Sequence, residues 1–151
     1  IDRLCRFLTA CAKPIAEIGN IGYATFVYLR PRERDLMQLI LYGTAADQNA
    51  LLRSLAALPD WCYREMTVTA CPDYDRFITS LGKSPPDCIV IAMDGAAGME
   101  GVIAAKSVCE TVPVLWFSDD NGFGTQFYRL GCTYFHQKPV SPQVLSAAEK
   151  P

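Results

Sequence analysis

Residues 88–93 read Cys-Ile-Val-Ile-Ala-Met, an uninterrupted apolar run that follows the pair Pro85-Pro86. A strand with one face in water alternates apolar and polar side chains, whereas a strand covered on both faces is apolar throughout. The run therefore predicts a central strand of a parallel sheet. A second run, residues 112–117 (Val-Pro-Val-Leu-Trp-Phe), predicts another buried strand.

Strand-like and helix-like segments alternate on both sides of these runs from Met37 onward. Further strands are expected at 38–42, 63–70 and 133–136, and helices at 51–58, 72–81, 99–109, 123–130 and from Pro142 on. Pro72 and Pro142 are expected to open their helices, because proline is favoured at the first helical position. Five such units predict an α/β domain over 37–151, with a doubly wound parallel sheet and any ligand at the carboxyl ends of its strands. Residues 1–36 are expected to be an N-terminal extension or arm.

Composition narrows the classes of function. The chain has 151 residues, of which 50% are hydrophobic, with a net charge of −2, seven cysteines and one histidine. This balance is that of a globular domain and argues against direct nucleic-acid binding, which needs a basic excess. The cysteines form no C-x-x-C pair, so they are expected to be free thiols of a cytoplasmic protein with no metal site. Neither a G-x-S-x-G motif nor a membrane span is present, and no enzymatic activity or membrane contact is expected.

The last third of the chain resembles the receiver domain of response regulators. Residues 131–139, Gly-Cys-Thr-Tyr-Phe-His-Gln-Lys-Pro, have the spacing of that family's lysine–proline signature. Ser118 ends a strand where the family carries Thr or Ser, Asp87-Cys88-Ile89-Val90-Ile91 resembles the third strand, and Gly98-Met99-Glu100-Gly101 resembles a G-M-D-G loop. The resemblance covers about 37–150. It implies a CheY-like, flavodoxin-like fold with strand order 2-1-3-4-5 and a role in two-component signal transduction.

The residues that would carry the family's phosphorelay chemistry depart from its pattern. In the family, an acidic pair after the first strand holds Mg²⁺, which neutralises charge during phosphoryl transfer to an aspartate at the end of the third strand. Here the first strand ends Tyr42-Gly43-Thr44, and the nearest acid, Asp47, is expected a turn later in the helix. Counting from Asp87 puts Ala92 at the acceptor position, while Asp94, two residues on, is the alternative acceptor.

These departures favour a degenerate receiver, or pseudo-receiver, that acts by protein contact and needs no cofactor. One alternative is a phosphorylatable receiver in which Asp94 is the acceptor, Ser118 and Lys138 assist, and Asp47 or Asp119 supplies a carboxylate to Mg²⁺. Another is a small-molecule or anion-binding module that uses Gly43 and Thr44 at a helix N-terminus. For Ser118 and Lys138, a strand-end hydroxyl and a solvated lysine remain the plain structural alternative.

The resemblance also implies where partners bind. The family's fourth helix, fifth strand and fifth helix form its dimer and output face, which corresponds here to about 121–145. A sensor kinase, an output domain such as a transcription regulator, or a second copy of the chain is the expected partner. Phe135 lies where the family has its switch aromatic, and Phe123, Phe127 and Tyr128 are candidate anchors, with core packing as the alternative for each. His136 is expected to be a packing or surface residue, and 119–122 a helix-entry turn. The short final helix suggests a piece of a longer regulator.

Overall fold

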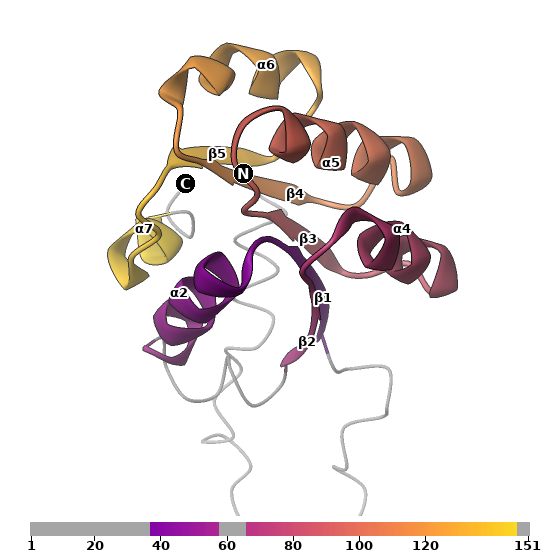
Figure 1. The fold of residues 1–151 in the computed structure, drawn as a ribbon, viewed down its shortest axis with the longest axis horizontal. Helices are drawn as coiled ribbons and strands as arrows, with labels where there is room; N and C mark the ends of the chain where they lie inside the picture. Colours follow the sequence, from indigo (N-terminus) through magenta and orange to yellow (C-terminus); the bar gives the residue numbers. More distant parts are fainter. Residues whose placement is uncertain (1–36, 58–65, 148–151) are drawn as a thin grey trace, which may run out of the picture.

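The computed structural model describes residues 37–57 and 66–147, so the expected extension at 1–36 lies outside the described residues. Five strands alternate with helices along the chain (Figure 1). The strands are β1 (Met37–Tyr42), β2 (Met66–Cys71), β3 (Cys88–Ile91), β4 (Val114–Ser118) and β5 (Tyr134–Gln137). The helices are α2 (Ala45–Ala56), α4 (Tyr74–Lys83), α5 (Gly95–Val108), the 3-10 helix η2 (Asn121–Phe123), α6 (Gly124–Arg129) and α7 (Pro142–Ala147).

All strand pairs are parallel and follow the order β2-β1-β3-β4-β5, which confirms the predicted topology. In register, Leu39 of β1 lies between Val68 of β2 and Cys88 of β3. Among the described residues, the path runs from β1 outward to β2 and then crosses to β3. The change of direction lies between β1 and β3, and it is there that doubly wound sheets bind their ligands.

The sheet is the middle of three layers, because its strands bury side chains on both faces. Helices α4, α5 and α6 lie on one face, and α2 and α7 lie on the other (Figure 1). Trp116 and Phe117 are neighbours in β4, yet they belong to opposite cores. Successive strand residues point to opposite faces, which explains why β3, and β4 as far as Phe117, are continuously apolar.

Helix starts differ from the expected ones because side-chain caps decide them. Pro72 does not open α4: the Asp73 carboxylate accepts from the Arg76 N–H at 2.8 Å, and the helix begins at Tyr74. Ser141 does cap α7, accepting from the Val144 N–H at 3.3 Å, with Pro142 at the first helical position. A short polar side chain that accepts a backbone N–H thus marks both starts.

The segments around the third strand and after the fourth also differ from expectation. The strand β3 ends at Ile91, so that residues 92 and 93 follow it, and α5 begins at Gly95 rather than at Met99. Small residues at 95–98 carried no apolar periodicity, although they are compatible with a helix. The expected helix at 123–130 is divided into η2 and α6. Of the expected strand 63–70, residues 63–65 lie outside the described residues.

The described cysteines are free thiols, as expected. Burial raises the pKa of Cys88 to about 12 and that of Cys132 to about 11. A thiol with such a pKa is protonated at neutral pH and is a poor nucleophile. Cys5, Cys11 and Cys62 lie outside the described residues. None of the described helices has the length and apolar composition of a membrane span.

Two glycines in helices provide a paired test of the packing. A Cβ on Gly98 would lie 2.1 Å from the Met93 carbonyl oxygen, whereas a Cβ on Gly82 would meet nothing within 4 Å. We expect Gly82→Ala to raise the free energy of unfolding by about 0.5–1 kcal/mol through helix propensity. Gly98→Ala should lower it despite the same propensity gain. Urea unfolding of both variants checks this, and equal gains would contradict the close approach at Gly98.

Candidate functional site

The carboxyl ends of the strands bring together residues that are far apart in sequence. Gly43 and Thr44 follow β1, Ala92 follows β3, Ser118 ends β4 and Lys138 follows β5. The Lys138 N–H donates to the Ser118 carbonyl at 2.8 Å, which continues the β4–β5 pairing by one residue. The lysine side chain is therefore set at the same edge of the sheet as the loops after β1 and β3.

The Lys138 ammonium binds three oxygen atoms. It donates to Asp94 Oδ1 at 2.6 Å, to the Ala92 carbonyl at 2.6 Å and to Asp47 Oδ1 at 2.8 Å. The side chain of Lys138 is 15% exposed and that of Asp47 is 20% exposed, whereas that of Asp94 is 47% exposed. Lys138 is thus not a solvated lysine, because two carboxylates and a carbonyl hold its charge.

Ala92 and Asp94, the two candidate acceptor positions, both reach this lysine, but by different groups. The Ala92 N–H donates to the Tyr42 carbonyl at 2.7 Å, and its methyl group is buried in the core on the α2 side. Ala92 therefore offers the pocket only its carbonyl oxygen. Asp94 precedes α5 as its N-cap residue without a capping bond, so its carboxylate is left to contact Lys138.

Asp47, which the sequence offered as a possible carboxylate donor to Mg²⁺ at this site, contacts the Lys138 ammonium instead. It lies in the first turn of α2, where the Thr44 hydroxyl donates to Asp47 Oδ2 at 2.7 Å and accepts from the Asp47 N–H at 3.3 Å. The Thr44 hydroxyl thus caps the helix and orients the carboxylate. Gly43 permits this arrangement, because a Cβ there would lie 3.2 Å from the Ala92 Cβ and 3.3 Å from the Asp47 Cβ. The sequence identified Asp47 as the nearest acid after β1, but no local pattern indicated that it pairs with Lys138.

Ser118 and Asp119 form a turn beside the pocket. The Ser118 hydroxyl is buried, donates to Asp119 Oδ1 at 3.4 Å and accepts from the Asp120 N–H at 3.3 Å. Asp120 in turn accepts from the Gly122 N–H at 2.7 Å and so caps η2, as a helix-entry turn requires. The Asp119 N–H donates to Asp94 Oδ1 at 3.2 Å, which links this turn to the pocket.

The Mg²⁺ site that the resemblance implies does not fit the residues present. Two of the carboxylates at the carboxyl ends of the strands, Asp47 and Asp94, neutralise Lys138, and that of Asp119 accepts from the Ser118 hydroxyl. The described residues include no cluster of three or more histidine, cysteine or acidic side chains that could hold a metal ion. A bound divalent cation would therefore compete with a positive charge that already occupies the oxygen donors.

Three of the four candidate interface aromatics pack against the core. The Trp116 ring lies 5.4 Å from both Phe123 and Phe135, and Phe127 lies 6.4 Å from Phe135. Tyr128, by contrast, is 80% exposed. The sequence did not predict that Trp116 contacts these rings. Trp116 lies two residues before Ser118 in β4, so its side chain points to the same face of the sheet as that of Ser118. His136 stacks beside Tyr134 in β5, with ring centroids 6.3 Å apart.

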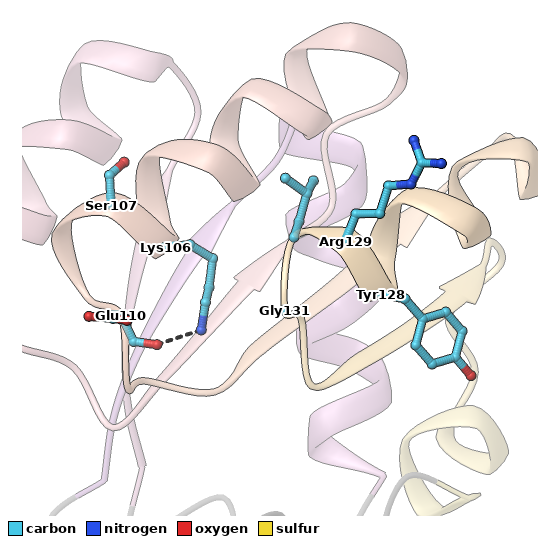
Figure 2. A pocket seen from close by; sticks show the side chains of 7 residues that line it. Lys106, Ser107, Glu110, Tyr128, Arg129 and Gly131 are labelled. Carbon is cyan, nitrogen blue, oxygen red and sulfur yellow. Dashed lines mark hydrogen bonds between the residues drawn. The ribbon is translucent and has the colours of Figure 1, made fainter.

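A cavity of about 640 Å³ lies at the opposite edge of the sheet, between the C-terminal ends of α5 and α6 (Figure 2). Its lining residues are Lys106, Ser107, Glu110, Tyr128, Arg129, Leu130 and Gly131. The Lys106 ammonium donates to the Glu110 carbonyl at 2.5 Å. Glu110 follows the C-cap residue Cys109, so the lysine connects the last turn of α5 to the segment that leaves the helix. We therefore assign Lys106 a structural role. The candidate functional site is the cluster around Lys138 at the carboxyl ends of the strands.

The unequal exposure of the two carboxylates predicts unequal contributions to stability. Asp47→Asn should lower the free energy of unfolding by about 1–3 kcal/mol, the range for a sheltered hydrogen bond to a charged group. Asp94→Asn should cost less than about 1 kcal/mol, because its exposed ion pair is screened by water. Urea unfolding measures both, with Glu100→Gln on the exposed side of α5 as a control for charge. An Asp47→Asn cost no larger than that of the control would contradict the assigned contact.

No protein-family model and no curated protein sequence matches this chain. Solved structures do match. The chain resembles chemotaxis protein CheY4 of Vibrio cholerae, with 17% identity and a TM-score of 0.59 over 74% of this chain and 94% of that one. It resembles the pilus assembly protein CpaE of Caulobacter crescentus, with 16% identity and a TM-score of 0.58 over 76% and 92%.

A response regulator of Burkholderia pseudomallei, solved with a phosphorylated aspartic acid and a calcium ion, is a further match. It shares 14% identity and a TM-score of 0.58 over 76% of this chain and 66% of that one, so this chain spans just under two thirds of its length. Each of these structures shares the layered parallel sheet described above. The described residues therefore have the fold of the response-regulator receiver domain, the CheY-like form of the flavodoxin-like fold.

Proposed function

We propose that this domain is a degenerate receiver, which signals through contact with another protein and not through Mg²⁺-dependent phosphoryl transfer to an aspartate. The observation that carries the proposal is the Lys138 ammonium, bound by Asp47, Asp94 and the Ala92 carbonyl. Receiver chemistry needs an acceptor carboxylate beside a metal ion that neutralises the developing charge. Here the residue after β3 is alanine, and the carboxylates nearby are engaged by a lysine.

Asp94 as a shifted acceptor is the second candidate. Its carboxylate contacts the signature lysine and is 47% exposed, so a small phosphate donor has access to it. Against it, Ser118 hydrogen-bonds within its own turn, and Asp47 is drawn to the lysine. The anion-binding alternative gains no support, because the Asp47 carboxylate stands in the first turn of α2, where an anion would be repelled.

The proposed contact surface is the face formed by α6, β5 and α7, residues 121–145. Its core-facing aromatics hold α6 against β4 and β5, and Tyr128 extends from α6 into solvent (Figure 2). Exposed aromatic side chains are enriched at protein interfaces, where they bury a large area at small entropic cost. A second copy of the chain is the first partner to test.

The absence of phosphoryl transfer is tested with the wild-type chain, Mg²⁺ and acetyl phosphate, read by intact mass. We expect no mass gain, and no amide NMR shifts near Ser118 and Lys138 on addition of beryllofluoride. The Burkholderia response regulator, which was solved with a phosphorylated aspartic acid, serves as the positive control. A gain of one phosphoryl group that Asp94→Asn abolishes would establish the second candidate instead.

The contact surface is tested by the introduction of a negative charge at its exposed aromatic. Tyr128→Glu should weaken self-association at least tenfold, because it places a carboxylate at the proposed anchor. Tyr74→Glu on α4 is the matched control, since Tyr74 is 42% exposed and lies outside this face. Sedimentation equilibrium measures both. A dimer that survives Tyr128→Glu, or a chain that stays monomeric throughout, would exclude self-association through Tyr128.

A further inference from the structure

The coordination of the Lys138 ammonium is complete. An ammonium group has three N–H donors and no acceptor. All three donors are used, on Asp94 Oδ1, the Ala92 carbonyl and Asp47 Oδ1, at 2.6–2.8 Å. The side chain is 15% exposed, so water contributes little to its solvation. The pocket supplies this cation with a shell of protein oxygen atoms.

The same oxygen atoms form the donor set that hard divalent cations prefer. Mg²⁺ is bound in proteins through one or two carboxylates and retains several waters, and Ca²⁺ takes carboxylates and main-chain carbonyls. Asp47 and Asp94 supply two carboxylates from different elements, and Ala92 supplies a carbonyl. What distinguishes this pocket from a metal site is that the positive charge it holds is covalently attached.

The three oxygen atoms are positioned by contacts that do not involve the lysine. The Thr44 hydroxyl donates to the Asp47 carboxylate at 2.7 Å, and the Asp119 N–H donates to that of Asp94 at 3.2 Å. The Ala92 carbonyl is set by its own N–H, which donates to the Tyr42 carbonyl at 2.7 Å. Removal of the ammonium should therefore leave the oxygen atoms near their present places, with two negative charges uncompensated.

We propose that the Lys138 ammonium is the resident cation of this pocket, and that it masks a divalent-cation site formed by Asp47, Asp94 and the Ala92 carbonyl. The inference rests on the proposed function, in which the pocket performs no metal-dependent chemistry. The tethered charge holds the loops after β1, β3 and β5 together, which a bound metal ion would otherwise do. The wild-type pocket is then independent of divalent metal, and loss of the lysine creates a metal site.

The test is Lys138→Met, in which a side chain of similar length has lost its charge. Thermal unfolding is followed with increasing MgCl₂, CaCl₂ or MnCl₂, at an ionic strength held constant with NaCl. A ligand that binds only the folded state raises the midpoint as its concentration exceeds its dissociation constant. We expect a midpoint that rises with millimolar metal in the variant and stays constant in the wild type. Mn²⁺ should also broaden the amide NMR signals of residues 47, 92 and 94 in the variant only.

Controls separate this site from general charge effects. Lys83→Met removes an exposed lysine at the end of α4 and should behave as the wild type does. Adding Asp94→Asn to Lys138→Met removes one ligand. The metal concentration required for the same rise in midpoint should then increase at least tenfold. Lys138→Gln, which keeps a polar side chain without charge, replaces the methionine variant if that chain does not fold, and should gain the same metal response.

Two outcomes would overturn the inference. The first is a wild-type midpoint that rises with divalent metal as steeply as that of the variant, because the ammonium would then not exclude metal. The second is a folded Lys138→Met or Lys138→Gln chain with no metal response at any of the three ions. Failure of the proposed function has a different signature, namely a phosphoryl mass gain on the wild-type chain, and it is measured without either variant.

Discussion

Five parallel strands, paired in the order β2-β1-β3-β4-β5 and covered on both faces, are the constraint on which the remaining structure depends. Parallel strands end at the same edge, so the loops after β1, β3 and β5 meet although up to 91 residues separate their contacting members. Burial of both faces makes this arrangement rigid, because a shift of one strand would move every side chain out of its core. The Lys138 pocket is a consequence of that geometry.

Charge balance within the pocket links its structure to its proposed role. Two carboxylates face one ammonium, and the position after β3 carries a methyl group in the core. A receiver that accepts a phosphoryl group changes the charge of this edge and so has two states to report. In the proposed function, the pocket closed by an internal ion pair takes no such chemical input. The proposal therefore assigns signalling to a surface of the fold, the α6–β5–α7 face, which carries the exposed Tyr128.

Sequence patterns predicted the elements better than their ends. Apolar runs located β1, β3 and β4, because strands covered on both faces leave an unambiguous signal. The start of α4 was wrong at Pro72, since the Asp73 side chain caps the helix one residue later. The start of α5 was missed because Gly95, Ala96 and Ala97 show no periodicity. Phe123, Phe127 and Phe135 could not be divided into core and surface by composition, because aromatic side chains serve both.

The sequence by itself determined the fold class, the strand order through a resemblance, and the residues that lie at the carboxyl ends of the strands. It also identified the missing acidic pair and the alanine at position 92. Only the tertiary structure decided what these residues do to one another. The contact between Lys138 and Asp47 spans 91 positions. No local pattern encodes it, because it arises from the register of separate strands and the direction in which Thr44 turns a carboxylate. Charge pairing across a sheet edge is a property of the folded chain.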